Sequence, residues 1–354
     1  MKHPSKPRSV SIRDVAERAG VSLGSASRVI NGAANVTNGT RERVLAAIAE
    51  LNYRPNHMAQ SLRLRSSRTI GCMLTDVTNT LYAGLFRALE DRFRTEGYML
   101  LLASGLNDAQ REIDILSTFR SRGMDGVILA PGNERDPEVV AAVEALNVPA
   151  VILDRDIRSN KDRVLFEQVA GMRQATENLL EWNHRRIALV LGQTPLSPLR
   201  RPMRRRVEGF RAAFAMHNLA VPEDLIVCVD EARDSAFERV KRMLAGPSRP
   251  TAVIAQGTNI LNECLNAINA AGLKIPTDIS VVTIGDPLFA RTYIPPLTTL
   301  RLSARQIAEA SANLLLARIR GDTPNAPPRT LRITAQWVPR GSCAPAPELA
   351  DARS

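Results

Sequence analysis

SIRDVAERAGVSLGSASRVING, residues 11–32, predicts two short helices joined by a tight turn. Ser11 is a suitable N-cap for the first helix, and Gly20 ends it because glycine accepts the left-handed conformation just past a helix end. Ser22 then caps a second helix, which Asn31-Gly32 closes. Two short helices around a glycine turn are typical of a helix-turn-helix, which places its second helix in the DNA major groove. An ordinary helical hairpin is the alternative interpretation.

A third helix is expected directly after this pair. Thr37 is its expected N-cap, and its apolar stripe consists of Val44, Leu45, Ile48 and Leu51. Pro55-Asn56 then interrupts the chain, and a further helix is expected over residues 57–63. About two turns is too short for a helix to be stable alone in water.

The positive charge of the chain is concentrated in this N-terminal part. The formal net charge is +11, and residues 1–69 hold 12 Lys+Arg against 4 Asp+Glu. A basic segment on a nearly neutral body is suited to a polyanion, and the helix-turn-helix identifies that polyanion as DNA. With 354 residues, of which 44% are hydrophobic, the chain is long enough for two or three domains with buried cores.

From Arg68 onward, short apolar runs alternate with amphipathic segments. The expected strands are TIGCML, YMLLLA, GVILAP and PAVILD in a first series, and RIALVLG, LIVCVD, TAVIAQ and ISVVTIG in a second. The expected helices lie near 82–95, 109–122, 136–145, 170–182, 204–217, 233–245 and 258–271. Such alternation predicts parallel sheets covered on both faces. The fold class is therefore α/β, with an all-α head and a body of two doubly wound subdomains that bind ligands at the carboxyl ends of their strands.

Several motifs together resemble the LacI/GalR family of bacterial repressors. DVAERAGVS, SRVING, TRERVLAAIAELNYRPN and AQSLR are similar to the opening of those repressors, and the similarity continues to about residue 340. The resemblance implies a body like that of periplasmic sugar-binding proteins, whose chain crosses between subdomains three times. On that pattern, residues 70–164 with about 297–322 form the first subdomain, and residues 165–293 with about 326–340 form the second.

The remaining boundaries follow from the same resemblance. Residues 1–55 form the DNA-binding head, 56–69 the hinge helix and linker, and 70–340 the effector-binding and dimerisation domain. The tail 341–354, GSCAPAPELADARS, is rich in small residues and proline and is expected to be disordered. It carries no leucine heptads of the kind that build a tetramerising helix, so a dimer is expected.

The resemblance also implies which residues contact DNA. The base-reading positions match Leu23 and Gly24, which offer apolar contact at most, and Arg28 can pair bidentately with guanine. Ser25 and Ser27 are expected at phosphates or base edges, or alternatively as a polar helix surface. Leu62 matches an apolar wedge for the minor groove, the alternative being a helix-packing residue. The expected DNA-binding set is Ser22, Leu23, Gly24, Ser25, Ser27, Arg28, Asn31, Asn56, Ala59, Gln60, Leu62 and Arg63.

An effector is expected in the cleft between the subdomains. Tyr82 matches the aromatic floor of the family's cleft, Asp154 and Arg155 its polar pair, and Arg206 its effector-binding arginine. Tyr82 could instead be a core residue and Arg155 a solvated charge. The expected effector-binding set is Leu81, Tyr82, Asp154, Arg155, Arg206, Gly257 and Asp286.

Two departures from the family pattern affect the expected ligand. Gly257-Thr258 stands where the family has Asn-Asp, and Gly285 replaces the first Asp of a pair, leaving Asp286. These changes remove a negative charge and an amide, whereas a run of arginines lies on the nearby loop and helix start: Arg200, Arg201, Arg204, Arg205 and Arg206. Arginines at a helix N-terminus favour anions, so a sugar acid, a carboxylate or a phosphorylated metabolite is expected. The alternative is that these arginines form a solvated face.

Other classes of protein receive less support. GVSLG at residues 20–24 matches the hydrolase motif GxSxG, but a helix precedes it instead of the strand that this motif needs. The four histidines and four cysteines show no catalytic or metal-ligand spacing, so no cofactor is expected. MKHPSKPRS does not read as a secretory signal, and no run approaches about 18 apolar residues.

The expected protein is a cytoplasmic homodimeric DNA-binding regulator, most simply a repressor, that recognises a palindromic operator and responds to a small-molecule effector without entering a membrane. The main alternative is a solute-binding protein of a transport system. That class would require a signal peptide and would lack the basic head.

Overall fold

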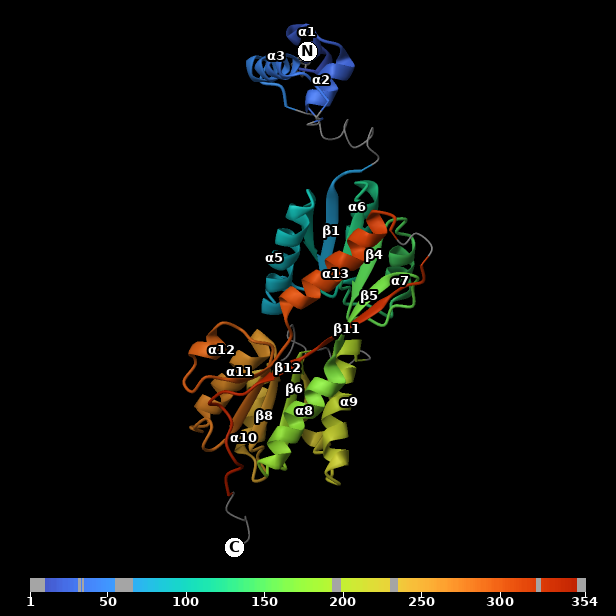
Figure 1. Ribbon diagram of the computed structural model, residues 1–354. Coiled ribbons are helices and arrows are strands. Elements are labelled where there is room, and N and C mark those ends of the chain that lie inside the picture. Colours follow the sequence, from blue (N-terminus) through green and yellow to red (C-terminus); the bar gives the residue numbers. More distant parts are fainter. Residues whose placement is uncertain are drawn as a thin grey trace, which may run out of the picture. The chain divides into compact units, whose positions relative to one another are not determined.

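The computed structural model describes residues 10–30, 33, 35–54, 66–192, 199–229, 235–322 and 326–348. The chain divides into two compact units, Met1–Ser67 and Arg68–Ser354 (Figure 1). No helix among these residues is long and apolar enough to cross a membrane.

The first unit packs three helices around a small apolar core. They are α1 (Ile12–Ala19), α2 (Leu23–Ile30) and α3 (Asn38–Glu50). Ser11 caps α1 in a capping box: the Ser11 hydroxyl accepts from the Asp14 backbone N–H, and the Asp14 carboxylate accepts from the Ser11 N–H at 2.7 Å. Gly20 ends α1 with φ at 62°, in the left-handed region. Both predicted ends of the first helix are therefore confirmed.

The apolar stripe expected on α3 is only partly correct. Thr37 is the N-cap residue, but its hydroxyl donates to the Thr40 hydroxyl at 3.0 Å instead of capping the backbone. Val44 is buried, whereas Leu45 is 52% exposed. A three-helix domain of this size covers only a narrow side of α3, and Leu45 lies about 100° around the helix from Val44. Leu45 is therefore a surface residue.

The second unit contains two six-stranded sheets. The first has the order β11-β5-β4-β3-β1-β2 and is parallel throughout. Its strands are β1 (Thr69–Leu74), β2 (Met99–Ser104), β3 (Gly126–Leu129), β4 (Ala150–Leu153), β5 (Asp162–Glu167) and β11 (Thr330–Thr334).

The second sheet has the order β12-β10-β9-β8-β6-β7, and only the β10–β12 pair in it is antiparallel. Its strands are β6 (Ile187–Gly192), β7 (Ile226–Val229), β8 (Ala252–Gln256), β9 (Ser280–Ile284), β10 (Thr298–Arg301) and β12 (Gln336–Val338). All eight strands expected from apolar runs are present. The four strands that the apolar runs did not indicate are β5, β10, β11 and β12.

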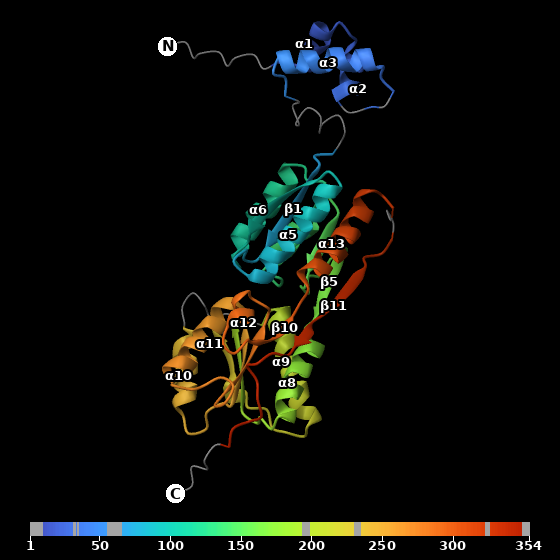
Figure 2. The ribbon, with the colours of Figure 1, turned by 60° about the vertical axis from the view of Figure 1, so that its left-hand side comes forward.

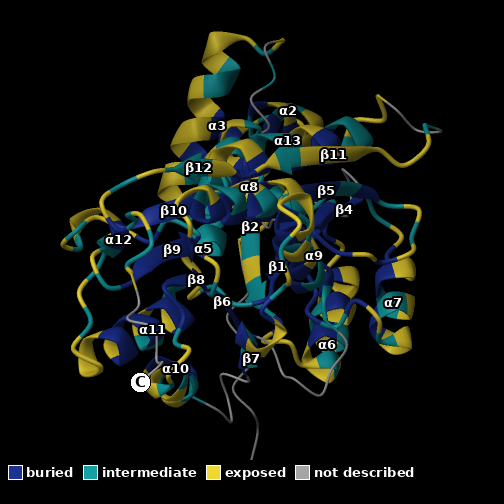
Figure 3. Cartoon of the chain, turned by 90° about the horizontal axis from the view of Figure 1, so that it is seen from below, coloured by how far each residue is buried: buried dark blue, intermediate teal, exposed yellow. Residues whose placement is uncertain are grey.

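Helices cover both faces of each sheet (Figures 1 and 2). On the first sheet, α5 (Thr80–Thr95) and α13 (Ala304–Ile319) pack on one face, and α6 (Ala109–Ser121) and α7 (Pro137–Glu144) on the other. On the second, α8 (Gln168–Glu181) and α9 (Arg201–Met216) oppose α10 (Ala236–Ala245) and α11 (Thr258–Ala270). The short η1 (Glu223–Leu225) and α12 (Phe289–Thr292) complete the unit. Figure 3 shows the inner strands buried between helices whose outer faces are exposed, whereas the edge strand β11 is exposed.

Helices α8 and α9 approach each other closely because Gly209 has no side chain. A Cβ there would overlap the carbonyl oxygen of Val169 and lie 3.0 Å from Cβ of Met172. This close approach holds Arg206, one turn earlier on α9, beside Gln168 at the start of α8. The packing of the second subdomain therefore positions a side chain of the candidate site.

The chain crosses between the two subdomains three times, as predicted, but the expected boundaries need correction. Strand β5 keeps residues up to Glu167 in the first subdomain, and β10 belongs to the second sheet instead of the first. Strand β11 belongs to the first sheet, although residues 326–340 were expected wholly in the second. The polar strands TTLR and TLRIT lack the apolar runs that reveal buried strands, so the sequence pattern misplaced these crossings.

Residues 341–348 are ordered, which corrects the prediction for that part of the tail. Ser342 is fully buried, and its hydroxyl accepts from the Thr298 N–H at 2.8 Å. The Val281 N–H donates to the Ser342 carbonyl at 2.9 Å. His184 is buried and contacts the Ala344 carbonyl at 3.0 Å through Nε2. Backbone bonding to β9 and β10 thus orders a segment whose composition indicated disorder; residues 349–354 lie outside the described residues.

Candidate functional site

The predicted DNA-contacting residues of α2 lie at its start and along its exposed side. The Ser22 hydroxyl accepts from the Ser25 N–H at 3.2 Å, which is the predicted capping bond. Leu23 is 44% exposed, and Arg28 is exposed with Nε donating to the Gly24 carbonyl at 3.3 Å. The start of α2 and the cationic side chain of Arg28 are therefore exposed to solvent.

Ser27 differs from the other predicted contacts because it is only 7% exposed. It is one of the three buried residues of α2, together with Ala26 and Val29. Several predicted contacts lie outside the described residues: Asn31, Asn56, Ala59, Gln60, Leu62 and Arg63. For these, the expectation stands as a prediction.

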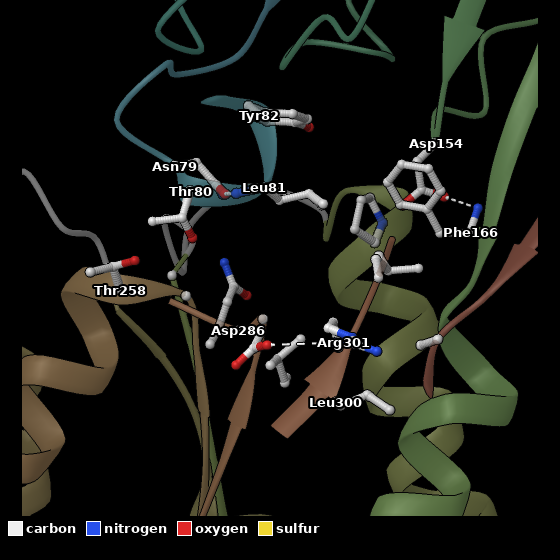
Figure 4. Close-up of a pocket in the computed structure, with 18 of the residues that line it drawn as sticks. Asn79, Thr80, Leu81, Tyr82, Asp154, Phe166, Thr258, Asp286, Leu300 and Arg301 are labelled. Atoms are coloured by element: carbon white, nitrogen blue, oxygen red, sulfur yellow. Dashed lines mark hydrogen bonds and ion pairs between the residues drawn. The ribbon is translucent and has the colours of Figure 1, made fainter. Parts of the chain in front are cut away.

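A cleft of about 640 Å³ opens where strands of both sheets of the second unit end. All seven residues predicted to bind an effector line it: Leu81, Tyr82, Asp154, Arg155, Arg206, Gly257 and Asp286. Figure 4 shows Asn79, Thr80 and Thr258 on one side of the space, and Phe166 on the opposite side. The volume and the mixture of aromatic and polar groups fit a small organic ligand.

A hydrogen-bonded chain links the two subdomains along one wall of the cleft. The Phe166 N–H donates to Asp154 Oδ1 at 3.0 Å, and Gln168 Nε2 donates to Asp154 Oδ2 at 3.1 Å. Arg206 Nε in turn donates to Gln168 Oε1 at 3.1 Å. Gln168 therefore fixes the guanidinium of Arg206 relative to a carboxylate of the other subdomain.

Arg201 also joins the two subdomains beside this chain. Its guanidinium forms an ion pair with Asp154, and its Nε lies 3.2 Å from Asp156 Oδ1. The Arg201 backbone N–H donates to Glu134 Oε1 at 2.6 Å. The side chains of Arg201 and Asp154 are only 5% and 2% exposed. We call the Arg201–Asp154 ion pair the interdomain pair.

Burial shifts the pKa values of Asp154 and Arg206, which lie along this wall of the cleft. It raises the pKa of Asp154 above its ordinary value, and the charge of Arg201 offsets that effect only in part. Burial lowers the pKa of Arg206 to about 10, and the charge of Asp154 offsets that effect only in part. Among the described residues, no carboxylate lies within ion-pair distance of the Arg206 guanidinium. Arg206 is thus a half-buried cation without a direct counterion.

Arg155 is engaged with its own subdomain. It is 3% exposed, its Nε donates to the Pro131 carbonyl, and its Nη2 donates to Thr75 Oγ1 at 3.0 Å. Its Nη1 donates to the Asp154 carbonyl at 3.0 Å. Arg155 therefore braces the loops after β1, β3 and β4, and it is not the solvated loop charge considered from the sequence.

Asp286 is surrounded by arginines at the opposite end of the cleft. Arg291 and Arg340 each donate to one of its oxygens at 2.8 Å, and Arg301 Nη1 lies 3.9 Å away (Figure 4). Burial alone would raise the pKa of Asp286, but the hydrogen bonds from Arg291 and Arg340 outweigh it and leave the pKa below the usual range. Both oxygens already serve arginine donors, which reduces the capacity of Asp286 to bind ligand hydroxyls.

The two glycines that depart from the family pattern have a backbone role. Gly257 has φ at 61° and Gly285 has φ at 109°, both in the region that favours glycine. The Gly257 N–H donates to the Ile284 carbonyl at 3.0 Å, and the Gly285 N–H donates to the Leu300 carbonyl at 2.9 Å. These positions shape the cleft floor without contributing polar side chains.

Sequence reasoning missed three residues that organise the site. Phe166 lies in β5, a strand whose polar ends concealed it, and Gln168 follows that strand. Glu134 lies in the loop after β3. Arg201 was noticed only as part of a basic run, with a solvated face as the alternative. For Glu134 the available signal was a carboxylate soon after a predicted strand, since such residues meet at one edge of a parallel sheet.

The comparisons with known proteins agree with this geometry. Residues 11–56 match the model for bacterial regulatory proteins of the lacI family, and residues 176–343 match a periplasmic binding protein-like domain. The ribose operon repressor of Escherichia coli K12 is 32% identical over 332 residues, covering 94% of this chain and 99% of that protein. The chain belongs to the LacI family.

Other relatives of this LacI-family chain include the transcriptional repressor PurR of Actinobacillus pleuropneumoniae, which is 30% identical over 94% of this chain and 97% of that protein. A lac repressor dimer bound to operator and the anti-inducer ONPF superposes with a TM-score of 0.81 at 28% identity, covering 95% of this chain and 100% of that one. A ribose-bound LacI-family regulator from Enterococcus faecium has a TM-score of 0.67 at 25% identity, covering 78% and 99%. The chain is a transcriptional repressor of this family with a DNA-binding head and an effector-binding body, and its relatives are DNA-binding repressors rather than enzymes.

Proposed function

We propose that this LacI-family chain acts as a homodimer on a palindromic operator, and that a small molecule in the cleft controls its affinity for that operator. The observation that carries the proposal is the joining, in one chain, of a capped helix-turn-helix to a cleft between two subdomains. A solute-binding protein of a transport system would have no use for the basic head. Catalysis is not part of the proposed function.

The proposed DNA contacts follow the exposed side of α2. We propose that Arg28, which is exposed, reads a guanine edge, while Leu23 and Gly24 make only apolar or close backbone contact. Ser22 and Ser25 lie at the helix start, where hydroxyls and N–H groups suit phosphates. Ser27 is left out of the proposed contacts because it is buried.

A second copy of the chain would cover exposed apolar side chains at the edge of the first sheet. Met99 and Leu102 on edge strand β2, and Leu106 just after it, are 64%, 38% and 50% exposed. Exposed apolar groups on an edge strand favour association with another chain. A two-fold symmetric dimer places its two heads on inverted half-sites, which is the basis for proposing a palindrome.

Effector and operator are coupled through the arrangement of the subdomains. The interdomain pair and the Gln168–Asp154 hydrogen bond both join the two subdomains at the cleft wall, so a ligand there changes the balance between subdomain arrangements. Coupling free energies of this kind are typically about 1–3 kcal/mol and are reciprocal between the two ligands. Because bacterial DNA lies in the cytoplasm, the proposed place of action is the nucleoid.

Replacing Leu62 by alanine tests the proposed minor-groove wedge. An apolar wedge stabilises only the bent, specific complex, so we expect Leu62→Ala to weaken binding to a selected operator by about tenfold or more, with little change on random-sequence duplex. Fluorescence anisotropy of labelled duplexes measures both affinities. Equal losses on the two duplexes would exclude the wedge, and no duplex binding by the unsubstituted chain would exclude the proposed function.

A further inference from the structure

The lining of the cleft carries more cationic than anionic side chains. Its lining holds five arginines and three aspartates: Arg155, Arg200, Arg206, Arg291, Arg301, Asp76, Asp154 and Asp286. We propose that the effector is an organic anion, with its carboxylate or phosphate group held by Arg206 and a hydroxylated body in the rest of the cleft. This inference rests on the proposed effector role of the cleft.

The aspartates of the lining are already engaged by protein donors. Both oxygens of Asp154 accept from Phe166 and Gln168, and both oxygens of Asp286 accept from Arg291 and Arg340. Asp76 accepts from the Thr78 N–H and the Thr78 hydroxyl, each at 2.8 Å. Acceptors for ligand hydroxyls are therefore scarce among the carboxylates, while the positive charge of the lining exceeds the negative.

Arg206 is the cation best placed to hold the anionic group. Its Nε is fixed by Gln168, and the described chain offers its guanidinium no ion-pair partner within 4.0 Å. A guanidinium in this state can offer its remaining N–H groups to a carboxylate or phosphate, a pairing whose planar geometry favours two parallel hydrogen bonds. Burial without a counterion also lowers the pKa of Arg206 to about 10, and a bound anion would reverse that cost.

A neutral sugar would leave this cost in place. It would occupy the cleft without supplying the charge that a half-buried guanidinium lacks, and a missing partner for a buried charged group costs more than the bond itself gains. The rest of the lining suits a hydroxylated body, because Asn79, Thr80 and Thr258 face the space and the ring of Tyr82 borders it (Figure 4). The same body with and without a negative group is therefore the informative comparison.

The test measures binding of matched ligand series to the full chain by isothermal titration calorimetry. The series are ribose, ribonate and ribose 5-phosphate, and glucose, gluconate and glucose 6-phosphate; inorganic phosphate is the probe that does not depend on the body. In at least one series we expect an anionic member to bind about tenfold or more tightly than the neutral sugar. The carboxylate and phosphate members distinguish the two sources of the negative group.

Variants assign the preference to Arg206. Arg206→Gln should reduce the affinity for the preferred anion and for inorganic phosphate by about tenfold or more, and Arg206→Lys should retain part of it. Arg205→Gln is the matched control, because Arg205 lies next to Arg206 on α9 but pairs with Glu208 at 2.8 Å. Thermal denaturation of each variant shows whether it is folded.

The outcomes separate this inference from the proposed function. A neutral sugar that binds as tightly as both of its anionic counterparts overturns the inference, as does phosphate binding that is absent or unchanged in Arg206→Gln. Anion binding through Arg206 by a chain that binds no duplex DNA would support the inference and overturn the proposed function. Duplex binding that is weakened by a neutral sugar would support the proposed function and overturn the inference of an anionic effector.

Discussion

Arg201→Met should lower the free energy of unfolding of the body by about 3–5 kcal/mol, because it leaves the buried Asp154 carboxylate without its countercharge. The methionine side chain keeps much of the apolar volume of the arginine, so the loss reports on charge more than on packing. Urea denaturation followed by tryptophan fluorescence measures it. The two tryptophans of the chain, Trp182 and Trp337, both lie in the second unit, so the signal reports on that unit.

Arg204→Met is the matched control for this prediction. Arg204 lies three residues after Arg201 on α9 and forms an ion pair with Asp156. The side chains of Arg204 and Asp156 are 34% and 39% exposed. An ion pair with this exposure contributes about 0–1 kcal/mol, so the control should lose little stability. The double variant Arg201→Met, Asp154→Asn should recover part of the loss, since it removes the uncompensated charge. Equal decreases in the free energy of unfolding for Arg201→Met and Arg204→Met would show that the interdomain pair contributes no more than an exposed ion pair.

The affinity of the full chain for duplex DNA should fall by about 10³–10⁵ as the salt concentration rises from about 50 mM to about 200 mM, if 6–10 phosphates are contacted. Residues 1–69 hold 12 Lys+Arg against 4 Asp+Glu, and a dimer presents two such segments. Each neutralised phosphate releases counterions, which makes the logarithm of affinity fall linearly with that of salt. Anisotropy titrations at several salt concentrations give the slope.

A weak salt response would contradict this account of the head. A fall below about tenfold over the same range would indicate contact with one or two phosphates at most, too few for two heads. Arg28→Gln provides a further check. Because Arg28 is proposed to read a base edge, its replacement should reduce affinity for the selected operator and leave the slope nearly unchanged.

The strands of this chain were predictable where apolar residues run without interruption. Strands such as AVIL (β4) and IALVLG (β6) are apolar throughout, because helices cover both faces of the sheet. Strands β10 and β11, TTLR and TLRIT, carry polar residues at positions where the chain passes between subdomains. Nothing local distinguishes such strands from loops, so the crossings could be counted from the family resemblance but not placed.

The residues of the candidate site were also predictable only in part. Tyr82, Asp154 and Arg206 were located because each matches a position of the family pattern in a recognisable segment of the body. The roles of Gln168 and Arg201 depend on contacts with residues from the other subdomain, and no pattern within one segment reveals such contacts. Asp286 lines the cleft as expected. Arg291 and Arg340 donate hydrogen bonds to its carboxylate, and no pattern in the sequence indicated that these two residues lie beside Asp286.

Selection of bound fragments from a random-sequence duplex pool by the full chain tests the central claim most directly. We expect enrichment of one inverted repeat whose half-sites lie about one helical turn of DNA apart, or a multiple of it. Mutating either half-site should then weaken binding equally, because the two heads of a symmetric dimer are identical. Enrichment of a single asymmetric site, or of no sequence at all, would contradict the account.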